Sequence, residues 1–153
     1  MLADVEGREV ELFPIGREVP VPTGAIDLLL ADDEGRPTLV ETKLARNPDI
    51  RRTVVGQILE YAAHVADWDL RKVEDVVTVY RHQTPPPASE TGLALDAEFR
   101  SELEKNLKAA QLRLIIAVDE MLDPLTKTVA FLNEMSQFEI FVLRYRSRTY
   151  PNY

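Results

Sequence analysis

Cysteine is absent from the 153 residues of this sequence, and histidine occurs only twice. The absence of cysteine excludes a disulfide framework and thiolate chemistry, and nothing in the composition requires an oxidising compartment. Long apolar runs are absent as well, because no stretch approaches the roughly 18 to 20 apolar residues of a membrane span. The first residues also lack a basic leader followed by an apolar run. We therefore expect a soluble, cytoplasmic protein with no membrane partner.

Positive charge is scarce, because 18 lysine and arginine residues stand against 26 aspartate and glutamate residues, which gives a net charge of -8. Phosphate contacts need clustered basic side chains, so this balance argues against binding of nucleic acid through a generally basic surface. Arginines nevertheless gather in two short segments, 44–52 and 138–153. Local basic patches are therefore expected on an acidic protein.

The chain is long enough for one compact domain and too short for two ordinary ones, so we expect a single domain over residues 1–153. Residues 83–92 (QTPPPASETG) contain three consecutive prolines and almost no large apolar side chain. This composition predicts a surface loop. A domain boundary there is the less favoured alternative, because neither side is large enough to bury its own core.

A β-hairpin is the clearest local signal. Residues 25–31 (AIDLLLA) and 38–44 (TLVETKL) are apolar and strand-like, and the intervening residues 32–37 (DDEGRP) are turn formers. Residues 9–13 and 15–21 precede this hairpin. Prolines interrupt and flank them, which is typical of short strands at the edge of a sheet.

Helices and strands are expected to alternate through the rest of the chain. Apolar residues at helical spacing predict a helix over 48–68, and residues 70–82 fit either a helix or a strand, with a helix favoured. Further elements are expected as a helix capped by Asp96, a strand over 112–118, a helix beginning with the cap Asp123 and the first-turn Pro124, and a strand over 138–146. This succession predicts an α/β fold with a mixed central β-sheet flanked by helices.

Three charged residues, Asp27, Glu41 and Lys43, interrupt the apolar strands of the hairpin. A turn centred near Glu34 would pair residues whose numbers sum to about 68, so Asp27 would face Glu41. Side chains alternate along a strand, and Lys43 would therefore share that face. The opposite face is then available for the core, and it carries Ile26, Leu28, Leu30, Val40 and Leu44.

Two carboxylates directly opposite each other repel unless a positive charge lies between them. A hard divalent cation, Mg2+ or Mn2+, is the natural candidate, because Mg2+ accepts one or two carboxylates and keeps several waters. Lys43 would then stand beside a water held by the ion, where it could activate that nucleophile or offset charge on a phosphate. The alternative is that Glu41 and Lys43 form a solvated ion pair. The continuous apolar strands favour the site.

The expected helix over 48–68 adds further candidates. Gln57 and Tyr61 are four residues apart and share one helix face. They could support the site, or Tyr61 could belong to the core and Gln57 could be a capping or solvent residue. Arg46, Arg51 and Arg52 are candidate contacts for phosphates, and a solvated helix end is the equal alternative.

The segments GAIDLLL, LVETKL and GQILEYA resemble the PD-(D/E)xK nuclease superfamily, which has the restriction-endonuclease-like fold. Their order and spacing are similar to those of RecB-type nuclease domains, which carry a Gln-x-x-x-Tyr helix. They also resemble the nuclease domains of archaeal and actinobacterial mismatch endonucleases, and related uncharacterised bacterial proteins. The resemblance covers residues 24–66 well and residues 112–146 more loosely.

The resemblance implies a metal-dependent endonuclease or exonuclease that acts on DNA with Mg2+ or Mn2+. Asp27 and Glu41 would be metal ligands, and the backbone carbonyl of Thr42 would be a further one. Lys43 would be the catalytic lysine, and Gln57 and Tyr61 would support catalysis or contact DNA. Such relatives usually begin with a helix that contributes an acidic residue, whereas this sequence predicts no helix before residue 9.

Two other classes stay open. A catalytically inactive module could keep the fold and bind DNA or regulate. A protein-interaction domain is the second alternative, and the acidic net charge mildly supports it. The strand expected over 138–146 could also pair between subunits of a homodimer.

Overall fold

A computed structural model describes residues 2–3, 7, 9–44, 50–85 and 96–146 of the chain. Most of the proline-rich segment lies outside these residues. The elements are β1 (Leu2–Ala3), β2 (Glu9–Val10), β3 (Leu12–Val21), β4 (Gly24–Asp32), β5 (Pro37–Lys43), α1 (Ile50–Ala66), α2 (Leu70–Gln83), α3 (Ala97–Lys108), β6 (Arg113–Val118), α4 (Asp123–Met135) and β7 (Glu139–Arg144). In this part of the chain, no helix has the length and apolar character needed to cross a membrane.

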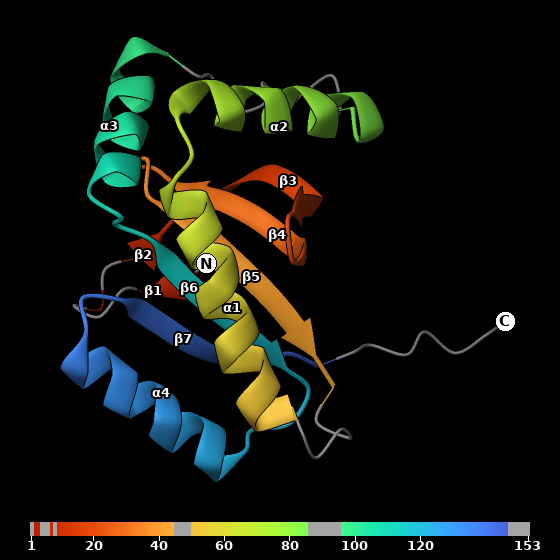
Figure 1. The fold of residues 1–153 in the computed structure, drawn as a ribbon, viewed down its shortest axis with the longest axis vertical. Helices are drawn as coiled ribbons and strands as arrows, with labels where there is room; N and C mark the ends of the chain where they lie inside the picture. Colours follow the sequence, from red (N-terminus) through yellow and green to blue (C-terminus); the bar gives the residue numbers. More distant parts are fainter. Residues whose placement is uncertain (1, 4–6, 8, 45–49, 86–95, 147–153) are drawn as a thin grey trace, which may run out of the picture.

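A five-stranded sheet in the order β3-β4-β5-β6-β7 forms the centre of the fold (Figure 1). The first three strands are antiparallel, whereas β5, β6 and β7 run parallel. A separate two-stranded sheet joins β1 to β2. The predicted α/β fold with a mixed central sheet flanked by helices is therefore confirmed.

The β4–β5 hairpin has the register expected from the sequence. Leu28 pairs with Val40 and Ala31 pairs with Pro37, so the residue numbers of each pair sum to 68. The turn between the strands is held by Asp32, whose Oδ1 accepts hydrogen bonds from the backbone N–H groups of Glu34 and Arg36. Turn chemistry and strand pattern thus fix the same register.

The edge strand β3 is one strand of ten residues, where the sequence predicted two short ones. The register shifts between Pro14 and Gly16, which is a β-bulge that lets the strand continue past the proline. Proline is tolerated there because an edge strand does not need every backbone N–H for the ladder.

Local capping explains where the helices begin. Residues 70–82, for which the sequence fitted a helix or a strand, belong to the helix α2. Asp69 caps this helix by accepting a hydrogen bond from the N–H of Lys72. Asp96 caps α3 through the N–H of Phe99, as expected. The expected cap of α4 was wrong by one residue: Asp123 is the first helical residue, and Leu122 occupies the cap position without a side-chain hydrogen bond.

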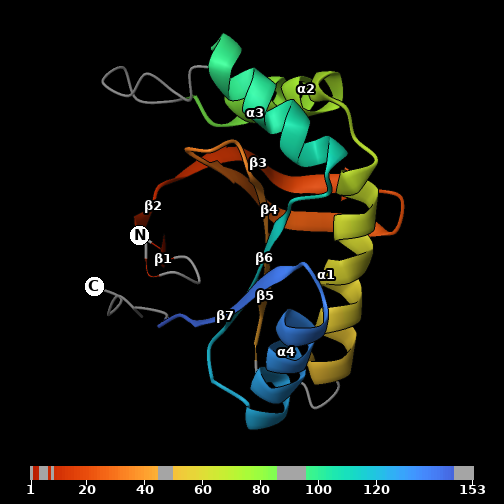
Figure 2. The same ribbon diagram turned by 90° about the vertical axis from the view of Figure 1, so that its left-hand side faces the viewer.

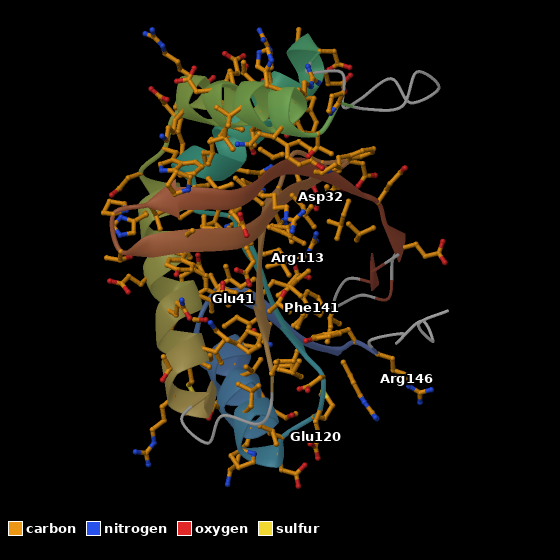
Figure 3. The ribbon with its side chains drawn as sticks, turned by 90° about the vertical axis from the view of Figure 1, so that its right-hand side faces the viewer. Asp32, Glu41, Arg113, Glu120, Phe141 and Arg146 are labelled. Atoms are coloured by element: carbon orange, nitrogen blue, oxygen red, sulfur yellow. The ribbon has the colours of Figure 1, made fainter. Side chains whose placement is uncertain are left out.

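The main core lies between the sheet and the helices that cover one of its faces, with α1 running across the strands (Figure 2). Leu39 of β5 is fully buried there with Val54 and Ile58 of α1. Since side chains alternate, Glu41 faces the same side as Leu39. Figure 3 shows Glu41 on the side of α1 and Phe141 on the other side of the sheet.

The sequence expectation for the core face was therefore wrong in part. Ile26 and Val40 are buried, but Leu28 is 37% exposed and Leu44 is 59% exposed. Val40 belongs to a smaller cluster with Ile115 on the face away from the main core. On β5, the face that carries Leu39 and Glu41, and not the face of Val40, turns towards the main core and α1, whereas on β4 the expected apolar residue Ile26 also belongs to the main core.

A buried ion-pair network ties the hairpin to the parallel strands. Arg113 of β6 donates from Nη1 to Asp32 Oδ2 at 3.0 Å, and from Nε to Glu139 Oε2 of β7 at 3.0 Å. Arg36 donates to the same oxygen of Glu139 at 2.7 Å. Asp32 and Arg113 are fully buried, so water cannot hydrate either charge if its partner is removed.

The strand β7 lies at the second edge of the sheet, and a side chain of α4 covers its beginning. Asn133 donates from Nδ2 to the carbonyl oxygen of Ile140 and accepts the N–H of Ile140 at Oδ1, both at 2.8 Å. The amide of Asn133 thus makes the two hydrogen bonds that a neighbouring strand would make at this residue.

Replacing Asp32 with alanine is expected to lower the free energy of unfolding by about 3–5 kcal/mol, because Nη1 of the buried Arg113 guanidinium loses its hydrogen-bond and ion-pair partner. The turn also loses the two hydrogen bonds that Asp32 accepts. Urea unfolding followed by circular dichroism measures the change. Glu104→Ala is the control, since Glu104 forms an exposed pair with Lys108 and should change stability by at most about 0.5 kcal/mol. Equal effects of the two substitutions would contradict this account of the network.

Candidate functional site

The candidate site lies where β4 and β5 leave their shared ladder. The pairs of this ladder run only as far as Leu28 and Val40, whereas β5 continues beside β6 up to the pair of Lys43 with Val118. The divergence leaves the N–H of Thr42 without a strand partner on the β4 side. Asp27 Oδ2 accepts that N–H at 2.7 Å, so a carboxylate bridges the opening between the strands.

Glu41 is 2% exposed, which is unusual for a carboxylate. Its Oε1 lies 2.8 Å from Nζ of Lys43, two residues further along the same strand. Its Oε2 is buried and has no hydrogen-bond partner. One oxygen is therefore compensated by an ammonium group, while the other has no partner in hydrogen-bond geometry. The backbone of Asp27 stabilises the carboxylate as well, as the weakest of the contributions to its pKa.

The electrostatics of the three groups are coupled. Burial raises the pKa of the Glu41 carboxyl above its ordinary value of 4.5, and the charge of Asp27 adds to this, whereas the hydrogen bond from Lys43 opposes it. The hydrogen bond to Glu41 raises the pKa of the Lys43 ammonium above 10.5, and burial opposes it. Lys43 is therefore a cation at neutral pH, placed beside two carboxylates.

Gln57 and Tyr61 lie together on α1, as their spacing predicted. Gln57 Nε2 donates to the hydroxyl oxygen of Tyr61 at 2.7 Å. Tyr61 is 2% exposed and belongs to the main core, so the core alternative describes its burial. Its hydroxyl nevertheless lies close enough to the charged groups to help raise the pKa of Lys43, as the last of the contributions to that pKa.

The expected phosphate contacts are described only in part. Arg52 is exposed near the start of α1. Arg46 and the side chain of Arg51 lie outside the described residues. The structure thus brings together Asp27, Glu41, Thr42 and Lys43 at the strand ends, with Gln57 and Tyr61 on the covering helix.

Sequence reasoning gave no role to Gly24, the first residue of β4. Its backbone lies against the Tyr61 hydroxyl, and a Cβ built there would be 2.5 Å from that oxygen. The contact joins residues 37 positions apart in the chain, so no local pattern marks it. Only the glycine at the beginning of GAIDLLL could have hinted at a close approach.

Asp27 and Glu41 are the two acidic side chains that the described residues bring to this site. Among the described residues, no group of three or more His, Cys, Asp or Glu side chains could hold a metal ion. An ion at this site would take Asp27 and Glu41, and backbone carbonyl and water oxygens would complete its shell. Mg2+ accepts such a ligand set, because it keeps several waters.

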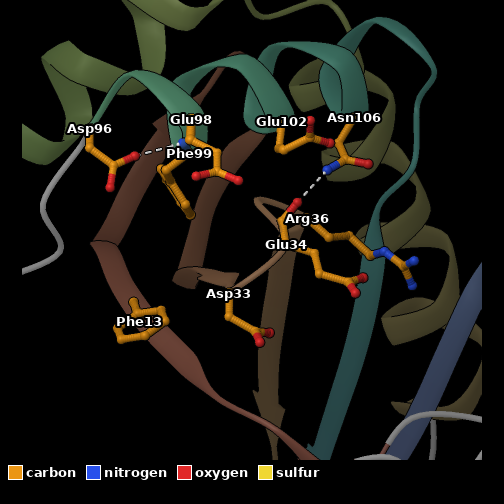
Figure 4. A pocket seen from close by; sticks show the side chains of 9 residues that line it. All are labelled: Phe13, Asp33, Glu34, Arg36, Asp96, Glu98, Phe99, Glu102 and Asn106. Carbon is orange, nitrogen blue, oxygen red and sulfur yellow. Dashed lines mark hydrogen bonds between the residues drawn. The ribbon is translucent and has the colours of Figure 1, made fainter.

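A cavity of about 640 Å³ lies elsewhere, between α3 and the β4–β5 turn (Figure 4). The carboxylates of Asp33, Glu34, Asp96, Glu98 and Glu102 line it, together with Arg36, Asn106, Phe13 and Phe99. The amide of Asn106 donates to the carbonyl oxygen of Glu34 and joins α3 to the turn. The excess of negative charge makes this cavity unsuitable for a phosphate.

Comparisons with known proteins give one structural similarity. No family model matches the chain, and no curated protein matches it. The chain is similar to a solved structure titled "Structure of EndoMS-dsDNA2 complex", with 14% sequence identity and a TM-score of 0.38. The similarity covers 90% of this chain and 38% of that one. The chain thus spans less than half the length of that protein.

Glu41→Gln is expected to gain stability relative to the unchanged protein as pH rises from about 4.5 through neutral, in buffer containing a chelator. The reason is linkage: the raised pKa of Glu41 favours the folded state while the carboxyl is protonated, and this contribution is lost as pH rises through the folded-state pKa. The glutamine stays neutral throughout. Urea unfolding at several pH values measures the difference.

Glu104→Gln removes an exposed carboxylate and serves as the control for this titration. A stability difference between Glu41→Gln and the unchanged protein that stays constant from pH 4.5 to 7.5 would show that burial does not perturb Glu41.

Proposed function

We propose that the chain is a metal-dependent nuclease that hydrolyses DNA phosphodiester bonds with Mg2+ or Mn2+. The observation that carries the proposal is the buried, unpartnered Oε2 of Glu41, in a site that also holds the carboxylate of Asp27. A buried carboxylate oxygen without a donor is costly unless a cation or a proton compensates it. A divalent cation would compensate Glu41 and Asp27 at once.

The ligand set has a third candidate in the backbone. The N–H and the C=O of one residue in an extended strand point to the same side, and the N–H of Thr42 points to Asp27. The carbonyl oxygen of Thr42 is therefore expected on the Asp27 side as well. Asp27, Glu41 and this carbonyl would hold the ion, with water completing its shell.

The lysine contributes charge. A bound ion would supply a nucleophile at neutral pH and would stabilise negative charge on the phosphate. Lys43 keeps its proton because its pKa is raised, so it acts by orienting the nucleophile and offsetting developing charge rather than by abstracting a proton. Gln57 supports the site through Tyr61, whose burial leaves it out of direct contact with DNA.

The choice of DNA as substrate follows from the resemblance to the PD-(D/E)xK nucleases. The succession of an antiparallel hairpin, a helix and a parallel strand (β4, β5, α1, β6) agrees with the restriction-endonuclease-like fold that this resemblance implies. Arg52, together with Arg46 and Arg51, would contact phosphates near the start of α1. Such contacts are local, as the acidic net charge requires.

Titration with Mn2+ or Mg2+ is expected to raise the melting temperature, because an ion that binds only the folded state stabilises it by mass action. Asp27→Ala should remove this shift. Asp33→Ala is the matched control, since Asp33 is an exposed aspartate in the turn of the same hairpin. A metal-induced shift that survives in Asp27→Ala would place the ion elsewhere.

Lys43→Ala is expected to abolish metal-dependent cleavage of DNA while the protein stays folded and binds Mn2+. Cleavage is measured on single-stranded, duplex, branched and mismatched substrates. Lys127→Ala, which removes an exposed lysine of α4, should cleave as the unchanged protein does. Cleavage that persists in Lys43→Ala would overturn the role of this residue. Metal binding without cleavage of any substrate would favour the non-catalytic DNA-binding alternative.

A further inference from the structure

At the tip of the β3–β4 hairpin, the backbone of Gly24 lies close to the Tyr61 hydroxyl of α1. Gly24 opens β4, and a Cβ added there would lie 2.5 Å from the Tyr61 hydroxyl oxygen and 3.4 Å from the ring carbon that bears it. Real Cβ atoms essentially never approach an oxygen so closely. Any side chain at position 24 would therefore push the hairpin tip away from the helix.

The Tyr61 hydroxyl cannot easily move aside. The ring is buried in the main core, and Gln57 donates a hydrogen bond to the hydroxyl oxygen at 2.7 Å. The oxygen is thus held between the amide of Gln57 and the backbone of Gly24. A buried aromatic ring among packed neighbours leaves the hairpin as the part that must shift.

Asp27 depends on where this hairpin tip lies. It comes three residues after Gly24, and the ladder that joins β4 to β5 begins only at Leu28. On the β5 side, the single hydrogen bond from the N–H of Thr42 holds its carboxylate. Glu41, by contrast, is anchored by pairing with Ile116 of β6. The spacing between the two carboxylates therefore depends on the Gly24 end of the hairpin as well as on the ladder that begins at Leu28 and Val40.

We propose that Gly24 and the Tyr61 hydroxyl are positioning groups, whose close contact sets Asp27 at the distance from Glu41 that a divalent cation needs. This role rests on the proposed function, because it concerns the same site. Neither group touches the ion. Gly24 acts by having no side chain, and Tyr61 acts as the surface against which the hairpin tip stops.

The test combines a disruptive substitution with one that relieves it. Gly24→Ala is expected to weaken Mn2+ binding about tenfold or more, in line with the effect of groups that orient metal ligands. Adding Tyr61→Phe removes the oxygen that collides with the new methyl group and leaves the ring carbon at 3.4 Å, within reach of small adjustments. The double variant should recover a measurable part of the affinity of Tyr61→Phe alone, because the φ of +159° at position 24 still strains the backbone of an alanine there.

Gly56→Ala is the matched control for replacing a glycine. Gly56 lies on α1 one position before Gln57, is exposed, and would meet no described atom within 4 Å of an added Cβ. Its Mn2+ affinity should equal that of the unchanged protein. Isothermal titration with Mn2+ gives the affinities, and circular dichroism in chelator shows which variants are folded.

The outcomes separate the two proposals. If the unchanged protein binds no Mn2+, the metal site itself is refuted, and the positioning role with it. If the unchanged protein binds Mn2+ and Gly24→Ala binds it equally well, only the positioning role is overturned. If Gly24→Ala does not fold, the double variant decides: a folded double variant that binds Mn2+ supports the contact, and one that is unfolded or binds no Mn2+ overturns it.

Discussion

The burial of one carboxylate, that of Glu41, constrains the whole arrangement. A charged group withdrawn from water costs several kcal/mol unless neighbouring groups replace the lost hydration. The strand register turns Glu41 towards α1, and among the residues that the structure describes, the cation that pairs with it is Lys43 of the same strand. The compensation of Glu41 therefore requires the hairpin register, the position of α1 and the placement of Lys43 at the same time. Burying a neutral glutamine at this position would cost less free energy than burying a carboxylate. Folding alone therefore does not account for the charge.

The strand β5 joins two halves of the sheet that differ in how firmly they hold the site. It closes an antiparallel ladder with β4 and opens a parallel one with β6. Glu41 and Lys43 lie on the parallel side, in the interior of the sheet, whereas Asp27 lies on the hairpin that bends away. Glu41 is thus held by the pairing of β5 with β6, whereas Asp27 lies beyond the end of the β4–β5 ladder.

The sequence predicted the elements that local chemistry determines. The hairpin followed from DDEGRP between apolar runs, and the beginning of α3 followed from its cap, Asp96. The segment of α2 fitted a helix or a strand, with a helix favoured. The convergence of Asp27, Glu41 and Lys43 was predictable because the turn sets the register. Which face of the hairpin meets α1 was not predictable, since both faces carry leucine, and the alternation of side chains along a strand does not indicate where a later helix packs.

Tertiary contacts explain what else the sequence left open. The approach of Gly24 to Tyr61 and the network of Asp32, Arg113 and Glu139 join residues distant in the chain. Each residue type has common surface roles, so its burial cannot be inferred from composition. The continuous β3 was missed because the bulge between Pro14 and Gly16 depends on pairing with β4.

The amide of Asn133 has a consequence for association between copies of this protein. A bare sheet edge is a template on which another chain can add a strand, and β7 carries no proline to discourage it. By occupying both backbone groups of Ile140, Asn133 blocks the first docking point along that edge. Strand addition could begin only further on, towards Arg144, where a second copy would bring like charges together. The beginning of this edge is thereby less open to strand addition by another chain.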